Sequence, residues 1–308
     1  MFRTVSDHWW VSALAMYMPP ILFAIPIGAL SLALLSLGRG RWLWTQVVAA
    51  VLLVFPLMGF VPPSTHGRAS GPRLRIMSYN VHVCAAGFDA LAARIEASKA
   101  DVVLLQEICG GAEPFVERLR RNYPLVRTDG QFLLASRYRS IETPMSVPFS
   151  PKDARAGFVR YVLDTSIGRL SVYSLHPISP RALFDALRRV RVRAIELGAL
   201  DGVAQANAAL REQQLMAATA AAAIDPNRVV LAGDTNLPGV SPTLTRDFAR
   251  YQDGFAAIGW GFGYTFPSRH PFLRLDRMFA GRGLHFTDFS IGCGIDSDHR
   301  CVIGELSH

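Results

Sequence analysis

Val229-Val230-Leu231-Ala232-Gly233-Asp234-Thr235-Asn236 carries the sharpest local pattern in this chain of 308 residues. An apolar run of strand length meets a glycine, which lets the backbone turn tightly, and then a carboxylate and an amide two positions apart. Asp234 is suited to orienting or deprotonating a water molecule, and the Asn236 amide is suited to holding an oxygen of a phosphate group. The alternative is a turn in which Asp234 and Asn236 serve only the backbone.

The same arrangement, a polar residue at the end of an apolar run, recurs along the chain. The other segments are Ser78-Tyr79-Asn80, Gln106-Glu107, Ser174-Leu175-His176, Leu275-Asp276-Arg277 and Ser297-Asp298-His299. We expect them to meet in one pocket that holds a hard cation and a phosphate. Mg²⁺ prefers oxygen ligands, and Glu107 is the best candidate because a buried strand would place its carboxylate at the end of a sheet. The alternative for Glu107 is a solvated loop glutamate.

Two of these segments end in histidine, whose protonation changes near neutral pH. One of His176 and His299 can take a proton from water, and the other can donate a hydrogen bond to a developing oxyanion. Asp276 is a candidate for orienting one imidazole and fixing its tautomer. A single histidine at a strand end is more often structural, but two in acidic surroundings favour catalysis.

The N-terminal part of the chain has a different composition from the rest. No charged side chain occurs from Trp9 to Gly38 or from Trp42 to Thr65. Roughly 20 apolar residues cross a hydrocarbon core, so we predict a membrane hairpin over residues 1–61, with transmembrane helices at about 10–36 and 42–61. A secretory signal peptide fits poorly because a second apolar stretch would remain, and a buried core hairpin is the other alternative. The expected location is a membrane, the bacterial inner membrane, which the chain would cross more than once.

The side of the membrane that the rest of the chain faces stays open. Arg39 and Arg41 lie between the apolar stretches and further arginines flank them, so the positive-inside rule, taken literally, places both ends in the cytoplasm. Export of the C-terminal part is the alternative. The cysteines do not decide the question, because they lack the paired spacing of a zinc site and are interpreted as small buried thiols. They are Cys84, Cys109, Cys293 and Cys301.

A linker is expected at residues 62–72, where Pro, Ser, Gly and Thr interrupt all periodicity, and a separate domain at 73–308. Apolar runs predict strands at 74–79, 102–105, 132–135, 158–163, 170–175, 229–232, 284–289 and 301–305. Helical patterns occupy 88–98, 113–122 and 182–223, the last broken near Gly198 and Gly202. This mixture predicts an α/β fold with two packed sheets and helices outside. Residues 73–308 contain 28 Arg and Lys against 23 Asp and Glu, a net charge of about +5, which is mild and has little weight as evidence for nucleic-acid binding.

The six polar segments, in this order, resemble the signature of the endonuclease/exonuclease/phosphatase superfamily, which is DNase I-like. The resemblance runs from about residue 74 to residue 306 and identifies the chain as a bacterial-type, membrane-anchored member. It implies a four-layer α/β sandwich, in which two mixed sheets lie between helices, with metal and phosphate at one edge of both sheets. Thr235 replaces a phenylalanine that is often found there, and Leu175 replaces a threonine.

The resemblance also implies roles for individual residues. Asn80, Glu107 and Asp298 would hold Mg²⁺, for which Mn²⁺ is a possible substitute, and His176 would contact the scissile phosphate. Asp234 and Asn236 would position the nucleophilic water and the phosphate. Asp276 would support His299, the general base. Apart from the resemblance, the loop before Asp276 is expected to line the substrate edge, where Tyr264, Phe266 or Arg269 would stack on the substrate or bind its phosphate, although a packed loop is the alternative.

The substrate is the least determined feature, because this fold serves many phosphoesters. We favour a membrane-anchored, metal-dependent phosphodiesterase of nuclease type, in which an activated water attacks in line. The first alternative is a hydrolase of lipid or small-molecule phosphates, similar to sphingomyelinases or inositol phosphatases. The second is a non-catalytic membrane-binding module. The expected partners are a nucleic acid or phospholipid substrate and the membrane, with no obligate protein partner.

Overall fold

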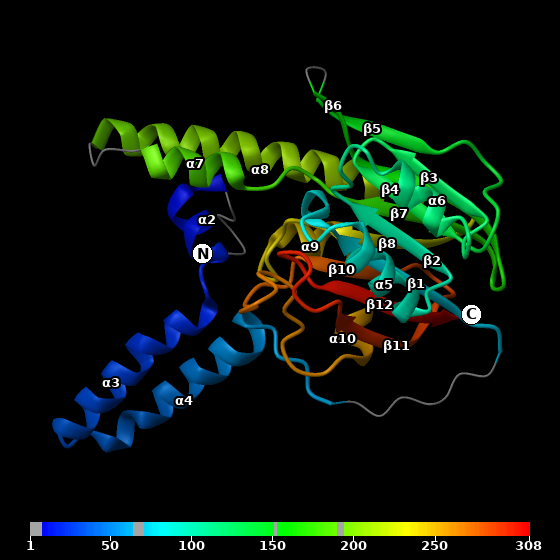
Figure 1. Ribbon diagram of the computed structural model, residues 1–308. Helices are drawn as coiled ribbons and strands as arrows, with labels where there is room; N and C mark the ends of the chain where they lie inside the picture. Colours follow the sequence, from blue (N-terminus) through cyan, green and yellow to red (C-terminus); the bar gives the residue numbers. More distant parts are fainter. Residues whose placement is uncertain (1–7, 64–70, 151–152, 190–193) are drawn as a thin grey trace.

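Two six-stranded sheets pack face to face in the computed structural model, which describes residues 8–63, 71–150, 153–189 and 194–308 (Figure 1). The first sheet has the order β11-β12-β1-β2-β4-β3 and contains β1 (Leu74–Asn80), β2 (Val102–Gln106), β3 (Leu125–Asp129), β4 (Phe132–Ser136), β11 (His285–Gly292) and β12 (Cys301–Ser307). The second has the order β5-β6-β7-β8-β10-β9 and contains β5 (Met145–Ser150), β6 (Asp153–Thr165), β7 (Gly168–Leu175), β8 (Arg228–Asp234), β9 (Gln252–Asp253) and β10 (Asp276–Ala280).

The central strands are apolar along their whole length because both of their faces are buried. Side chains alternate between the faces of a strand, so Ile76 of β1 points into the core between the sheets and Met77 points to the outer face. The core between the sheets contains residues of both of them, for example Leu104 of β2 and Val230 of β8, which are fully buried. The expected pair of packed mixed sheets is thus confirmed.

Helices cover both outer faces, which gives four layers. The helices of this part are α5 (Phe88–Ser98), α6 (Glu113–Leu119), α7 (Arg181–Arg189), α8 (Ala194–Ala223), α9 (Pro242–Asp247) and α10 (Gly254–Ile258). Apolar side chains of α5 and α6 pack on the first sheet, and those of α8 and α9 pack on the second. The break expected near Gly198 and Gly202 is wrong, since α8 continues through both. Each glycine destabilises the helix by only about 1 kcal/mol relative to alanine, and the burial of apolar residues such as Leu200 and Leu215 offsets this loss.

The N-terminal stretch is divided differently from the expectation. Its helices are α2 (Trp10–Tyr17), η2 (Pro20–Phe23), α3 (Ala24–Ser36), η3 (Gly40–Trp42), α4 (Leu43–Leu52) and η4 (Leu53–Leu57). A single helix over 10–36 is not formed, because the chain bends by 106° between Trp10–Tyr17 and Pro20–Ser36. The bend follows from Pro19, which disfavours helical geometry at Met18, where ψ is 155°. Within the described residues, Gly40–Leu57 is the one unbroken helix long and apolar enough to cross a membrane.

The paired helices α3 and α4 project from the sheets (Figure 1), and neither contains a buried residue. Their base is tied to the loop before β10, since Val61 and Gly261 exchange backbone hydrogen bonds of 2.8 and 2.9 Å. The ring of Phe60 also lies 5.2 Å from that of Phe262. Of the expected linker 62–72, residues 64–70 lie outside the described part.

Two cysteines form a disulfide, which corrects the expectation of four thiols. Cys293 and Cys301 are bonded, because β11 and β12 are antiparallel neighbours and bring the two residues together at the end of the pair. Cys84 and Cys109 are free thiols. Burial, together with the contact to Cys109, raises the pKa of Cys84 to about 12, so this thiol is poorly reactive.

Candidate active site

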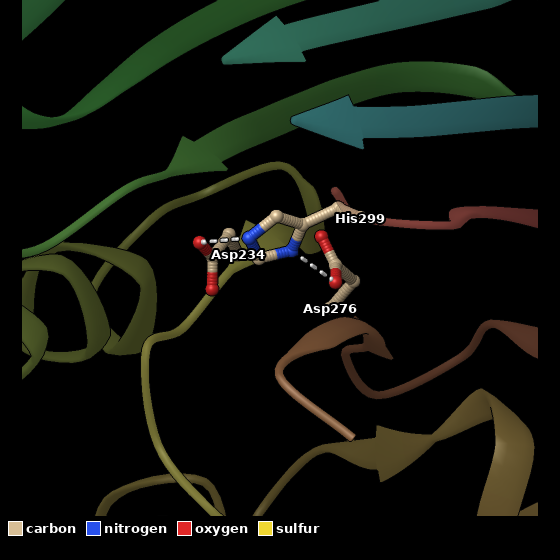
Figure 2. A group of neighbouring side chains, drawn as sticks. All are labelled: Asp234, Asp276 and His299. Atoms are coloured by element: carbon tan, nitrogen blue, oxygen red, sulfur yellow. Dashed lines mark hydrogen bonds and ion pairs between the residues drawn. The ribbon is translucent and has the colours of Figure 1, made fainter. Parts of the chain in front are cut away.

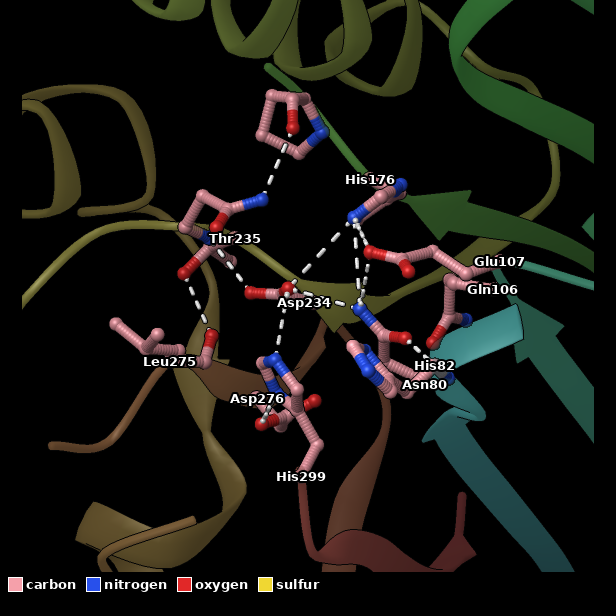
Figure 3. A network of polar contacts seen from close by, with 12 residues as sticks. Asn80, His82, Gln106, Glu107, His176, Asp234, Thr235, Leu275, Asp276 and His299 are labelled. Atoms are coloured by element: carbon pink, nitrogen blue, oxygen red, sulfur yellow. Dashed lines mark hydrogen bonds and ion pairs between the residues drawn. The ribbon is translucent and has the colours of Figure 1, made fainter. Parts of the chain in front are cut away.

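All six polar segments converge at one edge of the two sheets (Figure 3). The parallel pairs β1–β2 and β7–β8 end at this edge, whereas β10 and β12, which are antiparallel to their neighbours, begin there. The side chains supplied in this way are Asn80, Glu107, His176, Asp234, Asn236, Asp276, Asp298 and His299. Asp276 lies directly opposite Asp234 in the ladder between β8 and β10. The expected pocket is therefore assembled by strand topology.

The backbone of the site is held in unusual conformations. Glu107 and Asn236 have φ values of 56° and 50°, in the left-handed region. Such conformations cost about 1–3 kcal/mol for non-glycine residues and cluster at functional sites. Gly233 has φ of 152°, and a Cβ atom there would lie 2.0 Å from the carbonyl oxygen of Leu175. Only glycine therefore lets β8 approach β7 so closely just before Asp234.

One amide nitrogen is surrounded by acceptors at the centre of the site (Figure 3). The Asn80 Nδ2 atom donates to Glu107 Oε1 at 3.1 Å and to Asp234 Oδ2 at 3.2 Å. His176 Nε2 lies 3.5 Å from the same nitrogen and 3.2 Å from Glu107 Oε1. The side-chain oxygen of Asn80, Oδ1, accepts a hydrogen bond from the backbone N–H of His82 at 3.0 Å. The centre thus has more acceptors than donors.

The His176 ring is oriented by Gln131, a residue that the sequence analysis missed. Gln131 Nε2 donates to the carbonyl of Ala156 at 2.7 Å, which turns its Oε1 toward His176 Nδ1, also at 2.7 Å. Nδ1 is therefore the donor in this pair, and Nε2 faces Glu107 and Asp234. Gln131 lies in the turn between β3 and β4, outside every apolar run that was interpreted. Only its position directly before the strand at 132–135 could have drawn attention to it.

The His299 ring lies between two buried carboxylates (Figure 2). Its Nδ1 lies 2.8 Å from Asp276 Oδ2, and its Nε2 lies 3.6 Å from Asp234 Oδ2. Burial lowers the pKa of His299, but the charges of Asp276 and Asp234 outweigh it and raise the pKa to about 10. Burial raises the pKa of Asp234, against the opposing effects of the two imidazoles. In this arrangement His299 carries a proton and acts as a hydrogen-bond donor.

The Glu107 carboxyl has a strongly lowered pKa. Burial alone would raise its pKa, but the hydrogen bond and charge of His176, with the Asn80 amide, lower the pKa to about 2. Glu107 is therefore ionised at any physiological pH. A permanently ionised, partly buried carboxylate is a suitable ligand for a hard cation.

The segment that carries Asp298 is tied to β1. Ser297 Oγ donates to the carbonyl of Asn80 at 2.8 Å and accepts from the backbone N–H of His299 at 3.1 Å. The Asp298 side chain is about one-third exposed, at 37%, and its Oδ1 lies 3.3 Å from His82 Nδ1. His82 is a second residue that the sequence analysis did not single out.

The donor set fits a divalent cation. The carboxylates of Glu107 and Asp234 both accept from the one amide group of Asn80, and a cation would satisfy carboxylate lone pairs that this amide leaves free. Asp234, Asp276 and His299 also place ligand atoms within 4.8 Å of one another. That cluster is the less suitable cation site, because a protonated His299 has a hydrogen on both ring nitrogens and no lone pair left to bind a cation. The carboxylates Glu107 and Asp298 suit a cation best, and Asn80 would join them through the second lone pair of Oδ1, whose first accepts from His82.

A pocket of about 370 Å³ opens over these residues. Its lining includes Glu107, Asp234, Asn236, Asp298 and His299, and it is bordered by Tyr17, Phe184, Arg181, Arg188 and Phe266.

Tyr264 and Arg269, the expected substrate-binding residues, do not border this pocket. Tyr264 lines a separate cavity between the base of α3–α4 and the loop before β10, and its ring stacks on Phe262. Arg269 is exposed to solvent. Phe266, the third residue expected from this loop, does border the pocket, and its ring centre lies 4.8 Å from that of His299.

Comparisons with known proteins agree with this geometry. A model described as the endonuclease/exonuclease/phosphatase family matches residues 77–299, which is more than half of the chain. The comparison with curated proteins gives no match.

Solved structures share the fold at low sequence identity. An endonuclease/exonuclease/phosphatase from Beutenbergia cavernae is 18% identical, with a TM-score of 0.54, over 78% of this chain and 72% of that chain. D. rerio TDP2 complexed with a single-strand DNA product is also 18% identical, with a TM-score of 0.53, over 77% of this chain and 99% of its own. A mannosyl-6-phosphatase from Bacteroides thetaiotaomicron is 12% identical, with a TM-score of 0.51, over 76% and 100%. At these identities the likeness shows the fold alone.

Proposed function

Because the chain belongs to the endonuclease/exonuclease/phosphatase family, we propose that it is a membrane-tethered, metal-dependent phosphoester hydrolase. The observation that carries the proposal is the convergence of Asn80, Glu107, His176, Asp234 and His299 through contacts of 3.1–3.7 Å between segments far apart in the sequence. A fold retained only for binding would need neither the ionised Glu107 nor two oriented imidazoles.

Each residue has a definite task in this proposal. Glu107, Asn80 and Asp298 hold the cation, Mg²⁺ or Mn²⁺, which stabilises negative charge on the phosphoryl oxygens when bound. Asp234 orients the attacking water and accepts its proton, since its buried carboxylate has a raised pKa. Asp276 holds His299 in the protonated state, from which it donates to the reacting group.

The remaining polar groups bind the phosphate. His176 contacts the scissile phosphate through Nε2, because its Nδ1 is occupied by Gln131. Asn236 donates one amide hydrogen to the carbonyl of Pro177 at 3.0 Å and keeps the second for a phosphate oxygen. These contacts position the ester, and much of the rate enhancement of such enzymes comes from positioning and electrostatic stabilisation.

Nucleic acid is the first substrate class to consider. Arg181 and Arg188 border the pocket from one helix, α7, and can contact phosphates next to the scissile one. The structural neighbour TDP2 was crystallised with a single-strand DNA product.

A phospholipid is the second candidate, and one observation favours it. Leu273 lines both the catalytic pocket and the cavity at the base of α3–α4, so the site adjoins the segment proposed to enter the membrane.

Hydrolysis by the full-length chain in detergent micelles or lipid nanodiscs tests this function. With Mg²⁺, we expect turnover of bis(p-nitrophenyl) phosphate and of one class among plasmid DNA, RNA and phospholipids in mixed micelles. The small diester reports the chemistry, and the panel reports the substrate class. No hydrolysis of any of these would contradict the proposal and favour a non-catalytic membrane-binding module.

The paired helices α3 and α4 are the proposed membrane anchor. Their apolar side chains are exposed on the outside of the pair. Ile25, Leu32, Val47 and Leu52 are 59–70% exposed, and none of them packs on the sheets. Arg39 and Arg41 lie at the tip. Of the two orientations left open by the sequence, we propose the one with this tip in the cytoplasm, which places the catalytic part on the opposite side and departs from the literal positive-inside rule.

That orientation agrees with the disulfide between Cys293 and Cys301, because disulfides persist in oxidising compartments. We therefore expect the chain, denatured without reductant after isolation from cells, to present only the thiols of Cys84 and Cys109 to an alkylating reagent. After reduction all four cysteines of the chain should react. A variant with both Cys293→Ser and Cys301→Ser is the control. Alkylation of Cys293 and Cys301 without reduction would place the catalytic part in a reducing compartment.

A further inference from the structure

We propose that helix α2 forms a wall of the active-site pocket and that Tyr17 is a positioning residue for the turn that carries Asp234 and Asn236. This inference rests on the proposed hydrolase function. Sequence composition alone assigned α2 to a membrane span. Its contacts instead belong to the catalytic part of the molecule, as the position of α2 beside α7 and α8 indicates (Figure 1).

Helix α2 packs as a core element. Ala13 is only 1% exposed and lies in an apolar cluster with Leu183 of α7 and with Leu200 and Ala204 of α8. The start of the helix is also fixed, since the backbone N–H of Trp10 donates to Asp201 Oδ1 at 3.3 Å. The bend at Pro19 then turns α3 away from the sheets. Packing and bend together separate α2 from the exposed pair α3–α4.

The end of α2 reaches the catalytic turn. The Tyr17 hydroxyl donates to the backbone carbonyl of Asn236 at 2.7 Å. Asn236 has a left-handed backbone, and its N–H donates to Asp234 Oδ1 at 2.8 Å. Tyr17 therefore fixes the backbone carbonyl of Asn236, and the backbone N–H of the same residue fixes the Asp234 carboxylate. A shift of this turn would change the orientation of Asp234 Oδ2 relative to the attacking water.

The ring of Tyr17 is part of the pocket wall. It meets the ring of Phe184 edge to face, with centres 5.7 Å apart, and both residues border the pocket. Arg181 and Arg188 lie on the same helix as Phe184. The wall thus combines two aromatic rings with two guanidinium groups beside the scissile position. It is positioned to contact the part of the substrate next to the reacting phosphate.

Two substitutions separate the hydroxyl from the ring. Tyr17→Phe keeps the ring, so kcat for bis(p-nitrophenyl) phosphate should fall about five- to tenfold, the effect of losing one hydrogen bond, with KM little changed. Tyr17→Ala also removes the wall, so it should in addition raise KM for the natural class of substrate found in the panel. Tyr138→Phe is the matched control, because it removes a hydroxyl that donates to Ser166 at an exposed position, away from the active site. That control should behave as the unmodified chain.

A double-mutant cycle distinguishes positioning from general loosening of the fold. In the Asp234→Asn background, Tyr17→Phe should cause no further loss of the residual activity, because Tyr17 acts through the Asp234 carboxylate. A loss of equal size in both backgrounds, or a kcat for Tyr17→Phe equal to that of the unmodified chain, would overturn the inference. These outcomes require an active unmodified chain. If that chain hydrolyses no phosphoester, the proposed function fails instead.

Discussion

Replacing Asp234 with Asn should lower kcat for bis(p-nitrophenyl) phosphate by about 10²- to 10⁴-fold, the usual loss when a positioned general base is removed. The change keeps the shape of the side chain and its hydrogen bond from the Asn236 N–H, so folding should be preserved. It removes the group that accepts the proton of water and one of the two carboxylates that keep His299 protonated. Initial rates under saturating substrate measure the effect.

The control for this substitution is Asp288→Asn, on the exposed edge strand β11, where the carboxylate forms an ion pair with Arg75 at 3.4 Å, away from the active site. His299→Ala should cause a loss similar to that of Asp234→Asn, because it removes the donor held by Asp276. Circular dichroism and thermal melting confirm that the variants are folded. Turnover within threefold of the unmodified chain in both active-site variants would contradict the roles assigned to Asp234 and His299.

Replacing Glu107 with Gln should raise the Mg²⁺ concentration for half-maximal activity by at least about 100-fold, since even the outer partners of metal ligands change affinity by about 10- to 100-fold. Gln keeps the size of Glu but removes the negative charge of the carboxylate, whose pKa is lowered by His176 and Asn80. EDTA should abolish activity of the unmodified chain, and Mg²⁺ or Mn²⁺ should restore it.

Thermal melting gives a readout that does not depend on activity. A cation that binds only the folded chain raises its melting temperature by mass action, so Mg²⁺ should stabilise the unmodified chain and not Glu107→Gln. Glu113→Gln, at the exposed start of α6, is the matched control and should retain the Mg²⁺ response. Rescue of activity by Zn²⁺ alone, or an undiminished Mg²⁺ response in Glu107→Gln, would contradict an oxygen-ligand site at this carboxylate.

The sequence predicted the central strands well because their side chains are buried on both faces and form continuous apolar runs, as in Val102–Gln106. The strands that it missed include β3 and β5, at the edges of the sheets, where exposed side chains dilute the apolar pattern. Asn80, Glu107, His176 and Asp234 were found for the same reason, because each follows a clear apolar run, whereas Asp276 opens β10 and His299 precedes β12.

Residues outside such runs were not found, although some contact the site directly. Gln131 lies in a turn and Tyr17 in an apolar stretch, and only tertiary packing brings them to His176 and Asn236. The pairing of Cys293 with Cys301 likewise depends on the adjacency of β11 and β12, which spacing alone did not reveal. Helix α2 was assigned to the membrane because hydropathy does not distinguish lipid from a protein core.

The most direct test of the account is Mg²⁺-dependent hydrolysis of bis(p-nitrophenyl) phosphate by the purified full-length chain, measured side by side with Asp234→Asn at equal concentration. The account predicts turnover that EDTA abolishes and that the variant lacks, because the cation and Asp234 act on the same ester. Absence of turnover by the unmodified chain with Mg²⁺ or Mn²⁺, or equal turnover by both proteins, would contradict it.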